Sequence, residues 1–293
     1  MNTISTSSIL ELGFLTFQDI TEIDSFTIGK KHDIADNCLY WLKSISFYSS
    51  FSNGLVILSH LDYLDLKKSD LLNTDIIHLT CNDRSARLSF VQILTKVMSH
   101  IDISNYVHEH RSSTDDVIIM DNVYIGKNVK IGKKSIIFPN VVIHNGVIIG
   151  ENCTIRENSC LGTHGMGFEK DMNGDWIRFP QVGGLIIGDN VEIGSHSDIK
   201  RAALDNTIIE NNCKLGSYTN IGHNCVIGKN SIFTSQCVVA GSNIIGENFY
   251  MGINSSIKNG MKIGSNVTVG AHTFVRSNIN DGETHVGSPS KKI

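Results

Sequence analysis

Two residues of this chain, His223 and Gly241, have the types and the spacing that suit acyl transfer. His223 lies in the segment GHNC (222–225), and Gly241 lies 18 residues further on, in VVAGS (238–242). An imidazole with a pKa near neutrality can remove a proton from an attacking amine or hydroxyl, and a fixed backbone N–H can stabilise the oxyanion of a tetrahedral intermediate. The two groups act together only if the fold makes them neighbours.

A six-residue repeat predicts that they are neighbours. Bulky apolar side chains occupy every sixth position in two long stretches, a spacing that neither a helix nor an ordinary strand produces. A hexapeptide solenoid does, because each repeat is a short strand plus a turn, and stacked turns bury one column of side chains. The columns are Ile119, Ile125, Ile131, Ile137, Ile143, Ile149, Ile155 and Leu161, and then Ile209, Leu215, Ile221, Ile227, Phe233, Val239, Ile245, Met251, Ile257, Ile263, Val269 and Val275.

A second inward column lies two positions before the first. If three hexapeptides make one triangular coil, residues 18 apart lie directly above one another at the strand spacing of roughly 4.8 Å. His223 and Gly241 then share one corner of the solenoid. The second column holds small or modest residues: Val123, Val129, Ser135, Val141, Val147, Cys153, Thr207, Cys213, Thr219, Cys225, Ser231 and Cys237.

Composition excludes several other classes of protein. The net charge of the 293 residues is −4, so no basic surface favours nucleic acid. No apolar run approaches the roughly 18 residues of a membrane span, and the first residues lack the basic start of a leader, so we expect a cytoplasmic protein. The seven cysteines are an odd number without metal-knuckle spacing, and we expect the four on the inward column to be structural.

Metal binding by the histidines of the solenoid is not expected. A zinc site would need three imidazoles that converge. The candidates His144, His196, His223 and His272 are separated by 52, 27 and 49 residues (196 − 144, 223 − 196 and 272 − 223), none of which is a multiple of 18. We therefore predict no metal.

The six-residue spacing also divides the chain into domains. Residues 1–105 lack it; their apolar runs at 54–59 and 75–80 predict strands and residues 84–101 an amphipathic helix, so we expect a small α/β nucleotide-binding domain. Residues 106–275 form the solenoid, with a polar, glycine-rich external loop at 163–184 and a slip between Ile199 and Ile209 that requires a bulge. Residues 276–293 form a short tail. The predicted fold is mainly β: a left-handed parallel β-helix with a small N-terminal α/β domain.

Residues 165–246 resemble the UDP-3-O-acylglucosamine N-acyltransferases of the lipid A pathway. The shared features are the loop GMGF (165–168) followed by an aromatic residue and a PQ pair, the segments VEIG (191–194) and RAALDNT (201–207), the dipeptide HN and the segment AGS (240–242). The N-terminal region is similar to that family's small uridine-binding domain. The resemblance covers nearly the whole chain except the C-terminus.

The resemblance implies a role for individual residues. His223 would be the general base and the Gly241 N–H the oxyanion donor. The acyl or sugar group would contact the loop Gly165, Met166, Gly167 and Phe168, and we also expect Asn224 to contact substrate.

The resemblance also suggests where the nucleotide and the acyl donor bind. The family stacks the nucleotide base on aromatic side chains, for which Tyr40 and Trp41 are the candidates, with core packing as their alternative role. We expect Gly241, Arg276 and Lys291 to contact coenzyme A, with a solvated tail as the alternative for the two basic residues.

Three departures from the family bear on the substrate. An acidic residue seven positions before the base is replaced by Gly216, and a second histidine falls near Gly260. The family also continues into a helical extension that engages acyl carrier protein, whereas this sequence ends at Ile293.

Asp205, 18 residues before His223, is a candidate to orient the ring. Since the family is trimeric with sites between subunits, we expect a homotrimer.

Several functions agree with these residues. The leading hypothesis is an N-acyltransferase that moves a short acyl group, acetyl or a small hydroxyacyl, from acyl-CoA onto the amine of a UDP- or dTDP-linked amino sugar, as surface polysaccharide synthesis requires. The alternative is the lipid A enzyme itself, a UDP-3-O-acylglucosamine N-acyltransferase that uses hydroxyacyl carrier protein. A non-catalytic scaffold and an O-acyltransferase are the remaining hypotheses.

Overall fold

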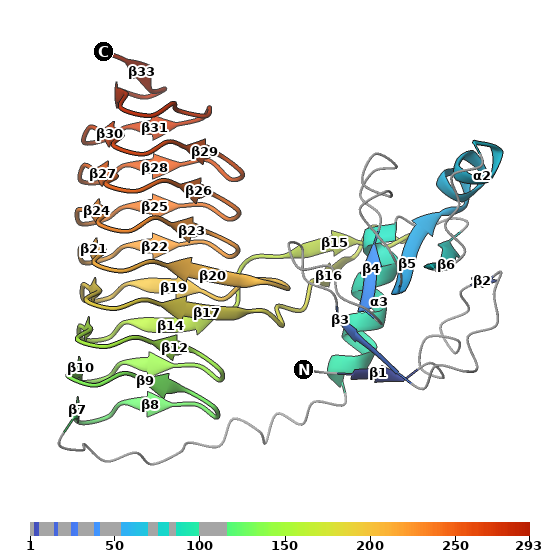
Figure 1. Ribbon diagram of the computed structural model, residues 1–293, viewed down its shortest axis with the longest axis horizontal. Coiled ribbons are helices and arrows are strands. Elements are labelled where there is room, and N and C mark those ends of the chain that lie inside the picture. Colours follow the sequence, from blue (N-terminus) through green and yellow to red (C-terminus); the bar gives the residue numbers. More distant parts are fainter. Residues whose placement is uncertain are drawn as a thin grey trace. The chain divides into compact units, whose positions relative to one another are not determined.

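The computed structural model describes residues 116–293 continuously, together with residues 3–5, 15–16, 25–28, 38–41, 54–69, 76–81 and 86–99 (Figure 1). The chain forms two compact units. The first comprises Met1–Ile103 with Met166–Pro180, and the second comprises Ser104–Gly165 with Gln181–Ile293. The segment 166–180, which is the central part of the external loop predicted at 163–184, therefore groups with the N-terminal region.

Within the described residues, the first unit contains a six-stranded mixed sheet and two helices. The central strands are parallel, and the strands at both edges are antiparallel. The sheet order is β1 (Thr3–Ser5), β3 (Ser25–Ile28), β4 (Cys38–Trp41), β5 (Gly54–Ser59), β6 (Ile76–Cys81) and β2 (Leu15–Thr16), and the helices are α2 (His60–Lys68) and α3 (Ala86–Ser99). The predicted strands and helix agree with β5, β6 and α3 to within two residues at each end. Neither helix is long and apolar enough to cross a membrane.

A β-hairpin completes this unit. Its strands, β15 (Phe168–Lys170) and β16 (Trp176–Arg178), are antiparallel. The buried ring of Phe179, just after β16, lies 6.4 Å from the ring of Phe90 in α3, and Arg87 of α3 forms a 3.0 Å ion pair with Glu169. Hydrophobic contact and charge both attach the hairpin to α3.

The second unit is a parallel β-helix with three flat faces (Figure 1). The ten-stranded face comprises β7 (Val117–Ile119), β10 (Ser135–Ile137), β13 (Thr154–Ile155), β18 (Glu192–Ile193), β21 (Lys214–Leu215), β24 (Ile232–Phe233), β27 (Tyr250–Met251), β30 (Thr268–Val269), β32 (Thr284–Val286) and β33 (Lys291–Lys292). The eight-stranded face comprises β8 (Tyr124–Ile125), β11 (Val142–Ile143), β14 (Cys160–Thr163), β19 (Asp198–Lys200), β22 (Asn220–Ile221), β25 (Val238–Val239), β28 (Ser256–Ile257) and β31 (Phe274–Val275). The seven-stranded face comprises β9 (Lys130–Ile131), β12 (Ile148–Ile149), β17 (Gly184–Ile187), β20 (Asn206–Ile209), β23 (Val226–Ile227), β26 (Ile244–Ile245) and β29 (Lys262–Ile263).

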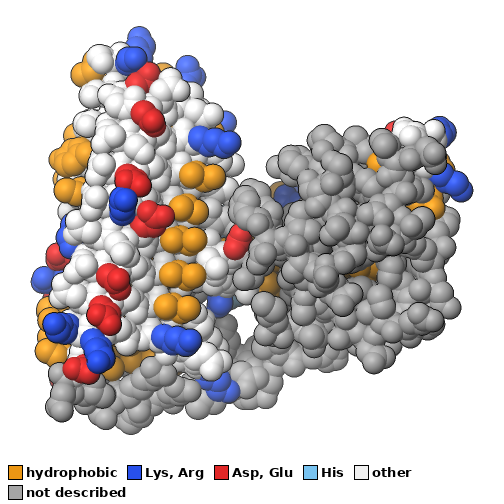
Figure 2. Space-filling view, viewed as in Figure 1, with side chains coloured by type: hydrophobic (Ala, Val, Ile, Leu, Met, Phe, Trp, Pro, Cys, Tyr) orange, Lys and Arg blue, Asp and Glu red, His pale blue; other side chains and the backbone are white. Residues whose placement is uncertain are grey.

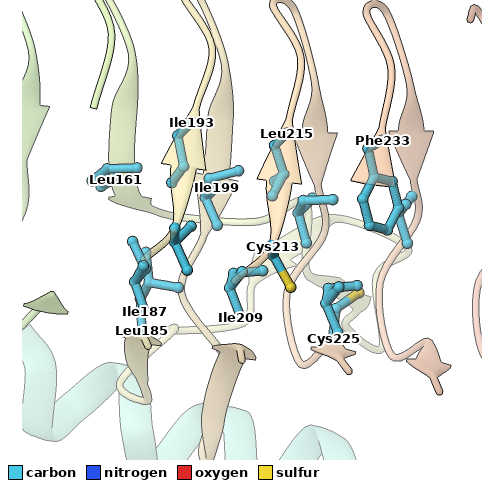
Figure 3. Close-up of a cluster of buried hydrophobic side chains, with 14 of the residues drawn as sticks. Leu161, Leu185, Ile187, Ile193, Ile199, Ile209, Cys213, Leu215, Cys225 and Phe233 are labelled. Atoms are coloured by element: carbon cyan, nitrogen blue, oxygen red, sulfur yellow. The ribbon is translucent and has the colours of Figure 1, made fainter. Parts of the chain in front are cut away.

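The two predicted inward columns form the interior of the solenoid. Figure 3 shows side chains from successive coils, among them Ile193, Ile209, Leu215 and Phe233, pointing toward one another between the faces. All members of the predicted columns are buried except Ile119 and Ile131, which lie near the first coil and are partly buried. The hydrophobic effect contributes roughly 25 cal/mol for each Å² of apolar surface removed from water, so this continuous column is the main source of stability.

The predicted stacking interval is the regular interval of the solenoid, as the pair Asn220 and Val238 illustrates. Two internal coils are longer. The hairpin insertion lengthens one of them to 38 residues, which is the separation of the stacked residues Asn152 and Asn190. The slip lengthens the next coil to 22 residues, which is the separation of Ser197 and Thr219. The extra residues of the second long coil leave the solenoid between β19 and β20, immediately below the corner that holds His223.

Asparagine is the usual residue at the corners of the coils. Most of the non-glycine residues described in the left-handed conformation are asparagines, among them Asn224 at φ 60° and Asn230 at φ 60°. Asparagine tolerates this conformation better than other side chains with a Cβ. The corner conformation is thus encoded locally, and it is repeated along the solenoid.

The outer surface of the seven-stranded face carries an apolar stripe. Register aligns the outward positions of successive strands, and the column that results is Lys130, Ile148, Ile186, Ile208, Val226, Ile244 and Lys262. We define the five aliphatic residues of this column as the apolar stripe. Figure 2 shows such a column of hydrophobic side chains, with basic side chains at both ends, on the side where Figure 1 labels β12, β20, β23 and β26.

The β-helix continues beyond Val275, where the boundary was predicted. Ile279 is buried above Ile263, and His285 in β32 takes the inward position above Val269. The segment 276–293 therefore adds another partial coil, slightly shorter than the regular ones, and the short antiparallel strand β33.

Candidate active site

His223 lies at the corner between the eight-stranded and seven-stranded faces, after β22 and before β23. The predicted neighbour, Gly241, lies at the same corner of the next coil. The Gly222 N–H donates to the Val239 carbonyl (2.8 Å) and the Ser242 N–H donates to the His223 carbonyl (2.8 Å), which fixes the two corners against each other. The prediction that His223 and Gly241 are vertical neighbours is confirmed.

The imidazole of His223 lies directly against Gly241. A Cβ built on Gly241 would lie 2.7 Å from Nε2 and 2.8 Å from Cε1 of the ring, closer than real atoms approach. The φ of Gly241 does not lie in the left-handed region, so the backbone itself does not require glycine. The imidazole is the reason that only glycine fits at this position.

A second glycine, Gly165, also lies close to the ring. A Cβ on Gly165 would lie 2.7 Å from Cδ2 of His223 and 3.2 Å from its Cβ. Gly165 is buried, and its N–H donates to Oε1 of Gln181 (3.1 Å), whose side chain is only 2 % exposed. Two glycines therefore lie close to the ring, and the buried amide of Gln181 fixes one of them, Gly165.

The Gly241 N–H is available as a donor. Within residues 116–293 it forms no hydrogen bond, whereas the Gly241 carbonyl accepts from the Gly260 N–H (3.0 Å). A Cβ on Gly222 would lie 2.5 Å from the Gly241 nitrogen, so glycine at 222 also leaves this amide uncovered. An N–H beside an imidazole has the geometry of an oxyanion donor next to a general base.

Nδ1 of His223 is bound to the side chain of the next residue. It lies 2.8 Å from Oδ1 of Asn224, which also accepts the Ala203 N–H at 3.1 Å. The Asn224 N–H in turn donates to Oγ1 of the buried Thr207 (2.9 Å). We expected Asn224 to contact substrate, but its amide oxygen already has two partners within the chain.

Asp205 does not orient His223, contrary to the suggestion from the regular interval. Because the coil there is one of the two long ones, Ile221 pairs with Ile199, and Arg201 occupies the position below His223. The carboxylate of Asp205 accepts its neighbouring N–H, from Asn206, at 3.0 Å. The slip in the repeat is the physical reason for this difference.

The two positions that depart from the related family also have defined surroundings. Gly216 lies one corner earlier than His223, between β21 and β22, and a Cβ there would lie 2.7 Å from the Ser235 nitrogen. Gly260 lies at the His223 corner two coils further on, with φ 75° and open space around it. Neither position supplies an ionisable group to His223.

Charged groups gather in the coil below His223. The carboxylate of Asp198 accepts the hydroxyl of Thr163 and pairs with the Lys200 ammonium. Burial, reinforced by the Arg201 charge, lowers the pKa of the nearby His144 below its ordinary value of 6.5. His144 is thus kept neutral near pH 7, in surroundings that already contain two cations.

The remaining residues of the predicted loop differ from one another in their surroundings. Gly165 lies beside the His223 ring. Met166 is 83 % exposed, and the guanidinium of Arg178 lies over the ring of Phe168 at 4.6 Å. Gly167 accepts a hydrogen bond from the Phe179 N–H (2.8 Å).

The predicted nucleotide-binding residues Tyr40 and Trp41 are in β4, and their side chains lie outside the described residues. Among the basic candidates, Arg276 is exposed at the His223 corner three coils further on, immediately after β31. Lys291 is exposed on β33 of the ten-stranded face, away from that corner.

Three residues at this corner were not predicted. Lys258 directly precedes Arg276 in the corner column, as the hydrogen bond from the Lys258 N–H to the Val275 carbonyl (2.9 Å) shows, and both side chains are exposed. Gln181 belongs to the PQ pair of the family resemblance, which was the available signal. Gly222 could have been recognised from the hexapeptide pattern, because the position after each inward aliphatic residue faces the next coil.

Comparison with known families defines the class of the solenoid. The description "Bacterial transferase hexapeptide (six repeats)" matches residues 128–163 and 206–241, and "Hexapeptide repeat of succinyl-transferase" matches residues 242–276. These segments of the second unit are therefore similar to the hexapeptide repeats of bacterial transferases.

Relatives of the chain carry the name of one kind of acyltransferase. The chain is 33% identical over 127 residues (43% of this chain, 38% of the relative) to the UDP-3-O-acylglucosamine N-acyltransferase of Delftia acidovorans. It is 49% identical over 69 residues (24% and 20%) to UDP-3-O-acylglucosamine N-acyltransferase 2 of Legionella pneumophila. The chain thus matches well under half the length of these relatives, and the matched part is similar to this type of acyltransferase.

A solved structure supports the fold. The UDP-N-acetylglucosamine acyltransferase of Francisella novicida aligns with a TM-score of 0.54 at 20% identity, covering 61% of this chain and 67% of that one. At this identity the likeness concerns the β-helix alone.

Proposed function

We propose that this protein is an N-acyltransferase that acylates the amine of a nucleotide-linked amino sugar at the His223 corner. The observation that carries the proposal is the contact between the His223 imidazole and Gly241, with Nε2 next to a backbone N–H that has no acceptor within residues 116–293. In this proposal His223 is the base and the Gly241 N–H is the oxyanion donor. The names of the sequence relatives support the same chemistry.

The mechanism follows from these two groups. Nε2 removes a proton from the acceptor amine as its nitrogen attacks the thioester carbonyl. The Gly241 N–H donates to the oxyanion that forms. Collapse of the intermediate breaks the carbon–sulfur bond, and the leaving thiolate receives the proton from the imidazolium, so that an amide and a free thiol result. Proton transfer of this kind typically contributes roughly 10²- to 10⁴-fold to the rate.

The acceptor we favour is a UDP-3-O-acylglucosamine, the alternative predicted above, rather than an amino sugar without an acyl chain. The relatives carry this substrate in their names. The apolar stripe gives an independent reason, because its member Val226 follows His223 by three residues and Ile244 lies above it in the next coil. A partly exposed apolar surface beside a polar site suits a substrate that carries a hydrocarbon chain.

The donor in this proposal is a thioester on a phosphopantetheine arm. Lys258 and Arg276 follow Gly241 along the corner, and within residues 116–293 neither forms an ion pair. At the strand spacing, Arg276 lies about 14 Å along the solenoid from His223, a distance that an extended pantetheine arm can span. The two cations would then contact the phosphate, which both coenzyme A and acyl carrier protein present. The expected homotrimer remains part of the proposal.

The test is an assay of thiol release. The protein is incubated with acetyl-CoA, hydroxyacyl-CoA or hydroxyacyl carrier protein, each against UDP-3-O-acylglucosamine, UDP-glucosamine and a dTDP-amino sugar. We expect turnover with UDP-3-O-acylglucosamine and a hydroxyacyl donor. The same acceptor with its amine already acylated is the matched control and should give none.

Other outcomes would replace this proposal. Turnover only with acetyl-CoA and an amino sugar that lacks the acyl chain would establish the short-acyl hypothesis instead. Equal turnover with the blocked amine would indicate O-acylation. Absence of turnover together with absence of nucleotide-sugar binding in calorimetry would favour a scaffold.

A further inference from the structure

We infer that Asn224 is the positioning residue of the site: it holds His223 in the tautomer that carries its proton on Nδ1 and leaves Nε2 free to act as the base. The inference rests on the proposed function for its catalytic meaning. The tautomer of His223 is inferred from hydrogen bonds alone and does not depend on the proposed reaction.

The first step is the identity of the Asn224 side-chain atom. Amide oxygen and nitrogen are distinguished by their hydrogen-bond partners. The atom that faces Nδ1 at 2.8 Å also lies 3.1 Å from the Ala203 nitrogen, whose N–H can only donate. It must therefore be the acceptor oxygen, as assigned.

The second step is the proton on the ring. A neutral imidazole has one N–H donor and one acceptor nitrogen. Since an amide oxygen only accepts, Nδ1 of His223 must be the donor, and the lone pair is on Nε2. Nε2 is the nitrogen that lies against Gly241, where the thioester would be attacked. The hydrogen bond thus selects the form of histidine that the reaction needs.

The third step is the rigidity of Asn224 itself. Its φ of 60° is the left-handed corner conformation, its N–H donates to the buried Thr207, and its oxygen is shared with the Ala203 N–H. Ala203 belongs to the extra residues of the long coil between β19 and β20, so the slip in the repeat supplies the backbone donor that fixes the amide. The irregular coil therefore has a role in holding the base.

Among the described residues, no carboxylate takes this role. Asp205 accepts from the Asn206 N–H, and Gly216 has no side chain to offer. The acidic residue of the resembled family is replaced by Gly216 in this chain, and the neutral amide of Asn224 lies beside Nδ1 of the ring. The base of this chain is oriented by a different residue, from a different place in the sequence.

The direct test is the ¹⁵N NMR spectrum of the histidine side chains near pH 9, well above the ordinary imidazole pKa of about 6.5. Comparison with His223→Ala identifies the His223 signals among the twelve histidines. We expect a protonated Nδ1 and an unprotonated Nε2 in the wild type and in Asn224→Asp, which keeps an acceptor oxygen, and a mixture of tautomers in Asn224→Ala. A protonated Nε2 in the wild type, or an unchanged pattern in Asn224→Ala, overturns the inference.

Asn230→Ala is the matched control, because Asn230 has the same φ of 60° at the next corner of the chain, and its loss does not reach the ring. It should leave the His223 signals as in the wild type. A change as large as that in Asn224→Ala would show that any weakened corner disturbs the ring, which contradicts a specific role for Asn224.

Kinetics give the second readout. Asn224→Ala should lower kcat by about 10- to 100-fold, as is typical when a partner that orients a functional histidine is removed. In the His223→Ala background it should have no further effect, because Asn224 acts only through that ring. An additional loss of similar size in this background would contradict the inference. The NMR result does not depend on turnover, so failure of the proposed reaction and failure of this inference are distinguishable.

Discussion

At the scale of single residues, the arrangement depends on the absence of side chains around His223 as much as on the imidazole itself. Gly165 and Gly241 lie beside the ring at positions where an added Cβ would come within 2.7 Å of a ring atom. Inserting atoms into a closely packed site typically costs about 1–3 kcal/mol. The two glycines therefore allow the ring to lie against the backbone donor.

Gly241→Ala tests this contact through stability. The added methyl group would meet Nε2, so we expect the unfolding free energy to fall by about 1–3 kcal/mol. In a His223→Ala background the obstacle is gone, and the same substitution should cost clearly less. Urea or thermal unfolding of the four proteins of this cycle measures the difference; an equal cost in both backgrounds would place the methyl group away from the imidazole.

The sequence predicted the main pair of the site but not the groups that hold it. His223 and Gly241 follow from the regular stacking interval, which is a property of the repeat. The role of Asn224 depends on the Ala203 N–H, and Ala203 lies in the one coil where the repeat slips, so counting along the chain pointed to Asp205 instead. The six-residue period cannot predict which residues are neighbours in a coil whose length departs from the repeat.

At the scale of the elements, the coil is the unit that positions the chemistry. Each coil contributes one residue to the column at the His223 corner. The buried side chains that the coil adds to the two inward columns fix the position of that residue along the solenoid axis. The predicted columns are buried because a six-residue period specifies one inward side per face. The repeat does not require apolar residues at the outward positions. The apolar stripe was therefore not predicted from it.

The rate at which the cysteines are alkylated tests whether reagent in the solvent can reach the interior of the β-helix. Burial raises the pKa of Cys213 and of Cys225 to about 11, and both are fully buried on the inward column. At pH 8 the reactive thiolate is then a very small fraction. In the folded protein we expect alkylation of the half-buried Cys160 well before either of them. Mass spectrometry of peptides after timed labelling measures this; labelling of Cys225 as fast as Cys160 would contradict a closed interior.

At the scale of the whole molecule, each unit follows its own pattern in the sequence. The β-helix follows a strict repeat, and its architecture was predicted nearly in full. The segment 166–180 was recognised as foreign to the repeat, but its grouping with α3 depends on Phe179, Phe90 and Arg87, which are contacts between distant parts of the chain. Contacts of that kind leave no periodic signal.

The C-terminal end of the β-helix is closed by a charged cluster. The carboxylate of Glu283 accepts from Nε2 of His285 (3.0 Å) and from the Lys292 ammonium (2.9 Å), and these hydrogen bonds lower its pKa to about 2. This cluster ties β33 to the last coil.

Glu283→Gln should therefore destabilise the protein in a pH-dependent way. A carboxyl whose pKa is lower in the folded state stabilises the fold above its unfolded pKa, near 4.5, and loses this contribution as the pH falls toward 2. We expect the wild type to melt at a higher temperature than the variant at pH 6, with the difference vanishing near pH 2. Glu247→Gln, which removes an exposed ion pair with Lys229, is the control and should change little. A difference that persists unchanged at pH 2 would contradict this assignment.

The central claim is that His223 removes the proton from the acceptor amine, and the turnover number of His223→Ala tests it most directly. With UDP-3-O-acylglucosamine and a hydroxyacyl thioester, we predict a loss of roughly 10²- to 10⁴-fold in kcat, the usual contribution of a general base. The circular dichroism spectrum should match that of the wild type, because the ring lies outside the buried columns. Turnover within a few-fold of the wild type would contradict the account.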